Sequence, residues 1–285
     1  MKTKYQLIAV DIDGTLLNSR KEIQPETLDA IRRVCAAGRT IVFDTGRAIC
    51  ELEELFIRLP EVRYAVFASG AGLYDGKERR AFSLRGIPET EAREILTLVR
   101  AKDVMPQIVL ADRDVIQSSH LARLEDFHME IYRPMYEKAM TLVPDIFAFA
   151  EACREPFLKL NLYHRDPAER LRTREQLAHL SVEKVFSEVI SLECSAKGVN
   201  KGSGLMQLCE MLHVPPEACI AVGDADNDLP MIRVAGLGIA MGNASEAIQR
   251  EADRVVGDLD HGGCAEAMLC LLEEDGNNAG APEPV

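Results

Sequence analysis

Residues 9–19 read AVDIDGTLLNS, and an apolar strand ends here in two aspartates, Asp11 and Asp13, followed at once by Gly-Thr. Asp-Gly between apolar runs is a common hairpin signal, so Asp13 and Gly14 alone fit a turn. A turn does not explain Asp11, because a strand such as YQLIAV, apolar nearly throughout, does not usually end in an unpaired carboxylate. Two carboxylates at the end of a strand indicate a site for a hard cation.

The composition is typical of a soluble globular protein with about two domains. The chain has 285 residues, of which 47% are hydrophobic and 28% charged. Its net charge of −13 argues against a nucleic-acid or anionic-membrane partner, so an anionic substrate has to be attracted locally. No apolar run approaches the ~18 residues of a bilayer span, and we expect a cytoplasmic protein, monomeric or homodimeric. The eight cysteines contain no C-x-x-C pair and are expected to be reduced core residues.

Alternating strand and helix patterns predict an α/β fold, a Rossmann-like three-layer core with a parallel sheet. The pattern is regular over 1–85, becomes a mixed α+β pattern over 86–188, and resumes over 189–272 from VISLEC onward. We therefore expect one core domain interrupted by an inserted α+β cap domain. A hairpin over 70–84 is predicted to leave the sheet, and the polar tail 273–285 is predicted to be disordered.

Two further clusters fit the binding of an anion. VFDTGR places Thr45, Gly46 and Arg47 directly after the second strand, at the edge where parallel sheets bind ligands. GVNKGSG places Lys201 at the start of a helix, where the dipole is already positive, which indicates a negative group nearby. A phosphate-binding P-loop is excluded because Lys201 precedes the glycine that it would have to follow.

The fourth cluster, AVGDADNDLPMI, also follows an apolar strand. Asp224, Asp226 and Asp228 have the spacing that opens an EF-hand loop, but Leu229 and Ala235 stand where Gly and Glu are required. The carboxylates are therefore predicted to lie at the same sheet edge as Asp11.

Together the clusters fit Mg²⁺ and a phosphoryl group. Mg²⁺ prefers oxygen ligands and keeps several waters, so two carboxylates and a backbone carbonyl suffice. Asp11 is the candidate nucleophile, which would form an aspartyl-phosphate, and Asp13 the candidate acid and base. Positioning, Mg²⁺ and Lys201 would stabilise the charge of the transferred group.

The set DIDGT, DTGR, Lys201 with Gly202, and GDADND resembles the four motifs of the haloacid dehalogenase-like superfamily, in its Cof-type phosphatase branch, whose inserted domain is the class IIB cap. The resemblance covers the core, about two-thirds of the chain. It implies that Asp11, the Asp13 carbonyl and Asp224 hold the metal, supported by Asn227 and Asp228. It also implies that Thr45, Gly46 and Lys201 hold the phosphoryl group, that Arg47 faces the substrate entrance, and that the cap closes over the site.

Two departures from the family pattern stand out. Ser69 replaces the usual Asn after the third strand, so a substrate contact there is in doubt. In the cap no motif can be transferred, and the polar candidates are interpreted as ordinary surface or strand residues: His120, His128, Lys159, Tyr163 and His164. The favoured function is a Mg²⁺-dependent phosphatase for small phosphorylated metabolites, sugar phosphates above all. The alternatives are a phosphomutase and a catalytically silent phosphosugar-binding module.

Overall fold

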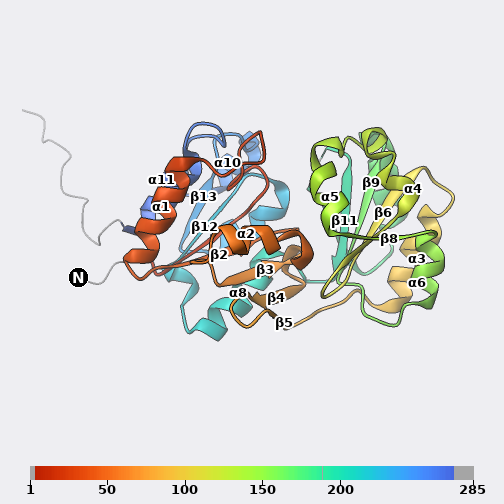
Figure 1. Cartoon of the computed structure of the whole chain (residues 1–285), viewed down its shortest axis with the longest axis horizontal. Helices are drawn as coiled ribbons and strands as arrows, with labels where there is room; N and C mark the ends of the chain where they lie inside the picture. Colours follow the sequence, from red (N-terminus) through yellow and green to blue (C-terminus); the bar gives the residue numbers. More distant parts are fainter. Residues whose placement is uncertain (1–3, 188, 273–285) are drawn as a thin grey trace, which may run out of the picture.

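The computed structural model describes residues 4–187 and 189–272 and builds them around two sheets. The first sheet has the strand order β14-β13-β12-β1-β2-β3-β4-β5, and the second has the order β10-β11-β9-β6-β7-β8. Figure 1 shows the two sheets in separate halves of the molecule, with the chain crossing between them twice. The predicted disordered tail, 273–285, lies outside the described residues.

The eight-stranded sheet is the centre of a three-layer α/β core, as predicted. Six of its strands run parallel, from β14 to β3, and are buried on both faces at the centre because helices cover both sides. The strands are β1 Leu7–Val10, β2 Thr40–Asp44, β3 Tyr64–Phe67, β12 Cys219–Gly223, β13 Leu237–Ala240 and β14 Arg254–Val255.

Two groups of helices cover this sheet. One face packs against α1 Pro25–Ala36, α2 Glu53–Arg58 and α11 Gly263–Leu269, and α1 and α11 lie side by side in Figure 1. The other face packs against α8 Lys201–Leu212, α9 Leu229–Val234 and α10 Glu246–Glu251. In α1, Ala30, Ile31 and Val34 are buried at helical spacing, so the apolar stripe of the sequence is the face that meets the sheet.

The hairpin over 70–84 differs from the expectation. Its strands β4 Gly72–Asp75 and β5 Arg80–Phe82 do not leave the sheet but extend it with antiparallel pairing beyond β3. The short polar turn between them permits an antiparallel return, and Leu73 on β4 adds its side chain to the core under α8.

The six-stranded sheet forms the second domain, which we call the cap. Its strands are β6 Val104–Val109, β7 Asp114–Gln117, β8 Met140–Val143, β9 Lys159–His164, β10 Val182–Phe186 and β11 Ser191–Ala196. The helices are α3 Glu89–Val99, α4 Ser118–Leu121, α5 Arg133–Ala139, α6 Ile146–Ala152 and α7 Pro167–Gln176. In Figure 1, α3 and α6 lie on the side away from the core, whereas α5 stands between the cap sheet and the core.

The second boundary of the cap corrects a sequence expectation. The sequence pattern predicts that the second core segment starts at 189 and includes residues 191–196, but β11 pairs antiparallel with both β9 and β10. An apolar run such as VISLEC fits either sheet, and only long-range pairing decides between them. The chain therefore returns to the core after Ala196.

None of the helices in residues 4–187 and 189–272 combines the length and the apolar character needed to cross a membrane.

Candidate active site

The four predicted clusters converge at one edge of the core sheet. Asp11 follows β1, Thr45 follows β2 and Asp224 follows β12, and these strands are neighbours in the sheet or separated by one strand. Lys201 is the first residue of α8. The helix starts there because Asn200 caps it: its side chain accepts the Ser203 N–H at 2.9 Å, while Ser203 Oγ accepts the Asn200 N–H at 3.0 Å.

Lys201 lies between two buried carboxylates. Its Nζ donates to Asp11 Oδ1 at 2.5 Å and to Asp228 Oδ1 at 2.6 Å, and its side chain is fully buried. Burial opposes the charge, but Asp11 and Asp228 hold the pKa of Lys201 well above its usual range. Lys201 is therefore a permanently charged cation, and the negative groups predicted near the start of the helix are Asp11 and Asp228.

Asp224 approaches the first strand closely. Its Oδ1 accepts from Thr15 Oγ1 at 3.1 Å and its Oδ2 from Asn243 Nδ2 at 3.1 Å. Gly14, with φ +89°, makes room, because a Cβ there would stand 2.4 Å from Asp224 Oδ2. Burial and the nearby Asp228 carboxylate raise the pKa of Asp224 to about 7.

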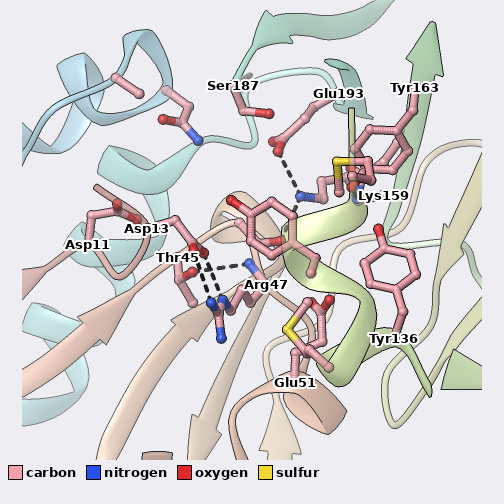
Figure 2. Close-up of a pocket in the computed structure, with 17 residues that line it drawn as sticks. Asp11, Asp13, Thr45, Arg47, Glu51, Tyr136, Lys159, Tyr163, Ser187 and Glu193 are labelled. Atoms are coloured by element: carbon pink, nitrogen blue, oxygen red, sulfur yellow. Dashed lines mark hydrogen bonds and ion pairs between the residues drawn. The ribbon is translucent and has the colours of Figure 1, made fainter. Parts of the chain in front are cut away.

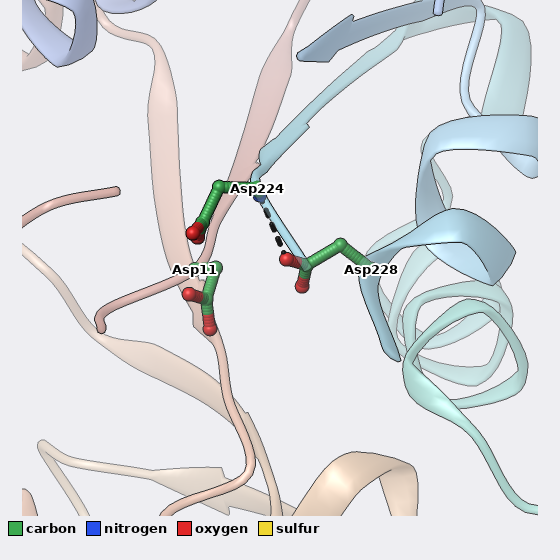
Figure 3. A group of neighbouring side chains, drawn as sticks. All are labelled: Asp11, Asp224 and Asp228. Atoms are coloured by element: carbon green, nitrogen blue, oxygen red, sulfur yellow. Dashed lines mark hydrogen bonds between the residues drawn. The ribbon is translucent and has the colours of Figure 1, made fainter. Parts of the chain in front are cut away.

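These carboxylates fit a hard cation. Oxygens of Asp11, Asp224 and Asp228 lie within 4.8 Å of one another, and Figure 3 shows the three side chains converging. Asp228 is already engaged, because its Oδ1 accepts from Lys201 and its Oδ2 from the Asp224 and Ala225 N–H groups, both at 2.9 Å. Burial, with Asp228 and Asp224 close by, raises the pKa of Asp11 well above its usual range, as expected of a ligand set that needs a counter-charge.

Asp13 lies in a different electrostatic setting. Arg47 forms a two-pronged ion pair with it, Nε to Oδ2 at 2.7 Å and Nη2 to Oδ1 at 2.9 Å, and Lys21 Nζ donates to Oδ1 at 3.0 Å. Burial opposes ionisation, but these two cations hold the pKa of Asp13 well below its usual range. Lys21 also donates to the Tyr132 hydroxyl of the cap at 2.8 Å, so Asp13 is linked to both domains.

Four of the predicted anion-binding residues line one cavity with Asp11 and Asp13, whereas the fifth, Lys201, does not border it. Thr45, Gly46, Arg47 and Asn227 all border it. Thr45 Oγ1 accepts the Arg47 N–H at 3.1 Å, which leaves the hydroxyl proton of Thr45 available to an anion.

This cavity, of about 90 Å³, lies between the two domains. Its cap wall includes two methionines together with Tyr132, Tyr136, Lys159, Asn161, Tyr163 and Glu193. Figure 2 shows Lys159, Glu193 and Tyr163 of the cap gathered across the cavity from Asp11 and Asp13 of the core. The cap is thus closed over the site.

A buried polar cluster joins the domains beside the cavity. Lys159 Nζ donates to the Gly46 carbonyl at 2.6 Å and pairs with Glu193 Oε1 at 3.1 Å. Ser69 Oγ donates to Glu193 Oε2 at 2.6 Å. The serine that replaces the usual Asn therefore contacts the cap.

Asp44, the last residue of β2, is a buried carboxyl behind the site. Its side chain is fully buried, and neither oxygen has a hydrogen-bond partner among the described residues. Burial raises the pKa of Asp44 well above its usual range, although the Lys201 charge acts in the opposite direction.

Sequence reasoning found the strand-end residues but missed most of the cap wall. Lys159 and Tyr163 were interpreted as ordinary strand residues, yet both line the cavity, whereas His120, His128 and His164 do not. Lys21, Asn161 and Glu193 were not singled out. The sequence held one signal for these residues, because alternate positions of a strand share a face. Residues 159, 161 and 163 share one face of β9, and residue 193 lies on β11, which pairs with it.

Comparisons with known proteins show the family to which the chain belongs. A family model for haloacid dehalogenase-like hydrolases matches residues 8–268. The chain is 29% identical to phosphatase YwpJ of Bacillus subtilis, over 94% of this chain and 100% of that protein. It is 26% identical to pyridoxal phosphate phosphatase YbhA of Escherichia coli, over 89% of this chain and 93% of that protein.

Solved structures give the same picture. A haloacid dehalogenase-like hydrolase from Bacillus subtilis superposes with a TM-score of 0.82 at 26% identity, covering 92% of this chain and 98% of the other. One from Bacteroides thetaiotaomicron gives a TM-score of 0.79 at 26% identity, covering 93% and 98%. The phosphatases among the relatives confirm the predicted enzyme class, a phosphoric monoester hydrolase. The chain therefore belongs to the haloacid dehalogenase-like hydrolase family, as its Cof-type motifs predicted.

Proposed function

We propose that this protein is a Mg²⁺-dependent phosphatase that hydrolyses small phosphorylated metabolites, sugar phosphates among them, through an aspartyl-phosphate at Asp11. The observation that carries the proposal is that Asp11, whose carboxylate accepts from Lys201 at 2.5 Å, and Asp13 border the same cavity between the core and the cap. The relatives named as phosphatases, one of them for pyridoxal phosphate, support the reaction and the size of the substrate.

Asp11 acts as the nucleophile. A carboxylate oxygen of Asp11 attacks phosphorus, the bond to the leaving oxygen breaks, and water later cleaves the aspartyl-phosphate to release inorganic phosphate. Lys201 favours the ionised form of Asp11 against the effect of burial and neutralises charge on the transferring group, joined by Thr45 and the backbone at Gly46. Mg²⁺, held by Asp11, Asp224 and the Asp13 carbonyl, would supply further neutralisation of the phosphoryl charge.

Asp13 handles the proton. It takes up a proton when the substrate phosphate draws Arg47 and Lys21 away, gives that proton to the leaving alkoxide and takes one back from the attacking water, so it is protonated again after hydrolysis. Before substrate enters, Arg47 and Lys21 pair with Asp13. A phosphoryl group offers these cations another anion, and Asp13 is then free for proton transfer.

The remaining residues support this arrangement. Asp228 orients Lys201 and fixes the loop that carries Asp224 through two backbone N–H groups. Asn227 borders the phosphoryl position, and the cap excludes water from the first displacement.

The test is hydrolysis of p-nitrophenyl phosphate by Asp11→Asn, with Asp226→Asn as the matched control. Asp226 lies in the same loop as Asp224, but its side chain is exposed and it does not border the cavity. We expect Asp11→Asn to lose turnover at least a thousandfold with an unchanged circular dichroism spectrum, and the control to keep it. Unchanged turnover in Asp11→Asn would overturn the assignment of the nucleophile. Phosphate release that requires a bisphosphate activator would instead favour the phosphomutase.

A further inference from the structure

A row of polar side chains crosses the core-facing side of the cap sheet. Asn161 on β9 stands opposite Glu193 on β11 and opposite Gln107 on β6. The alternate residues Leu160 and Leu162 point to the other face, where they join the apolar cluster. Asn161 and Glu193 border the cavity, so this row faces the leaving group of a bound ester.

Most hydrogen-bonding groups of the row are already used. Gln107 Oε1 accepts from the Tyr136 hydroxyl at 2.8 Å and from the Tyr163 hydroxyl at 3.1 Å, so both phenolic protons are committed. Glu193 accepts from Ser69 and pairs with Lys159.

Asn161 is the exception. The residue is only 5% exposed, and its Oδ1 has no hydrogen-bond partner among the described residues. Its Nδ2 lies 3.4 Å from the Tyr163 hydroxyl oxygen. A buried acceptor left unpaired is destabilising, so a ligand that donates a hydrogen bond to it gains binding free energy.

The other groups around the cavity share this excess of acceptors. Asn227 Oδ1, on the core side, is also buried without a partner among the described residues. Two cations border the cavity, and both Arg47 and Lys159 are already paired with carboxylates. The carboxylates number four: Asp11, Asp13, Glu51 and Glu193.

Building on the proposed phosphatase function, we propose that the leaving group carries hydrogen-bond donors, hydroxyl or N–H, one of which Asn161 Oδ1 accepts. The same cavity rejects leaving groups that end in a carboxylate, because such a group would face Glu193 and the Asn161 oxygen of the cap and Glu51 of the core with no uncommitted cation. Asn161 is in this view the residue that distinguishes donor-bearing from acidic substrates.

The size of the cavity limits the test substrates. A water molecule needs roughly 10–15 Å³ of such space, so a cavity of about 90 Å³ holds about half a dozen positions of that size. The test substrates therefore carry a small leaving group of two carbons.

The experiment uses three matched esters on the full chain with Mg²⁺: ethyl phosphate, 2-hydroxyethyl phosphate and 2-phosphoglycolate. They differ only in whether the leaving group ends in methyl, a donor or a carboxylate. With released phosphate as the readout, we expect kcat/KM for 2-hydroxyethyl phosphate to exceed that for each of the others at least tenfold. Asn161→Leu should lower it about tenfold towards the ethyl phosphate value, with ethyl phosphate unchanged within twofold.

Two further variants keep the result interpretable. Ser195→Ala, on β11 two residues beyond Glu193 and outside the cavity lining, is the matched control and should leave all three values unchanged. Asn161→Asp keeps an acceptor oxygen, and should retain the hydroxyl preference while lowering 2-phosphoglycolate further. Equal or better turnover of 2-phosphoglycolate by the parent protein would overturn the proposal. An equal loss on all three esters in Asn161→Leu would also overturn it, since that marks a merely structural residue. If p-nitrophenyl phosphate is also untouched by the parent protein, the proposed function itself fails.

Discussion

We predict that Asp44→Asn stabilises the protein at neutral pH and that the gain grows with pH. Asp44 is fully buried without a hydrogen-bond partner among the described residues, and burial raises the pKa of its carboxyl well above the usual 3.8. Above pH 3.8 the unfolded chain has lost this proton while the folded protein keeps it, so the folded state binds more protons. The free energy of unfolding therefore falls as the pH rises above 3.8. The fall ends when the pH passes the pKa of Asp44 in the folded protein.

The magnitude follows from proton linkage. While the folded carboxyl stays protonated, the free energy of unfolding falls by about 1.4 kcal/mol per pH unit for this one group. Asn has nearly the same shape and does not titrate, so the difference in unfolding free energy between variant and parent should grow with pH, by up to about 1.4 kcal/mol per pH unit for as long as the folded carboxyl stays protonated.

The assay is urea unfolding in EDTA, followed by circular dichroism at pH 5, 6 and 7. Other titrating groups are present in both proteins and cancel in the difference. Asp29→Asn, on the exposed side of α1, is the control and should give the same small difference at each pH. A difference for Asp44→Asn that does not change with pH would show that Asp44 is ionised in the folded protein, and the reasoning from burial would be refuted.

Three other predictions concern the site. EDTA should abolish hydrolysis and added Mg²⁺ should restore it. Asp224→Asn should raise the Mg²⁺ concentration for half-maximal activity at least tenfold. Activity that survives EDTA would contradict the predicted dependence on Mg²⁺. Lys201→Met should abolish turnover and lower the free energy of unfolding by about 3 kcal/mol, because Asp11 and Asp228 lose their buried cation; an unchanged urea midpoint would speak against it. Asp13→Asn should turn over p-nitrophenyl phosphate slowly and accumulate phosphoenzyme, because this leaving group needs no proton but the attacking water still needs a base. Acid quenching with labelled substrate detects the phosphoenzyme. Turnover as fast as that of the parent protein would argue against the role of Asp13.

The core site could be predicted because each of its residues stands next to a recognisable local pattern in the sequence. Asp11, Thr45 and Asp224 each follow an apolar strand, and parallel strands bring their carboxyl ends to one edge without further information. The three-layer core follows from the same alternation of strands and helices.

The cap wall was not predictable in this way. Asn161 and Glu193 are polar residues in half-apolar strands, and the same pattern describes any strand with one solvated face. Their meeting depends on the pairing of β9 with β11, which in turn depends on β11 lying in the cap. Lys21 lies in a polar loop, SRKEI, and no pattern in the sequence predicts its contacts with Asp13 and Tyr132.

The short return from the cap has a mechanical consequence. Strand β11 ends at Ala196 and helix α8 begins at Lys201, so only residues 197–200 separate the strand that carries Glu193 from the helix that carries the active-site lysine. Because this connection is so short, an outward movement of the cap would displace the first turn of α8, where Lys201 lies. Opening of the cap to admit substrate would thus be coupled to the position of Lys201, and a longer connection between β11 and α8 would weaken that coupling.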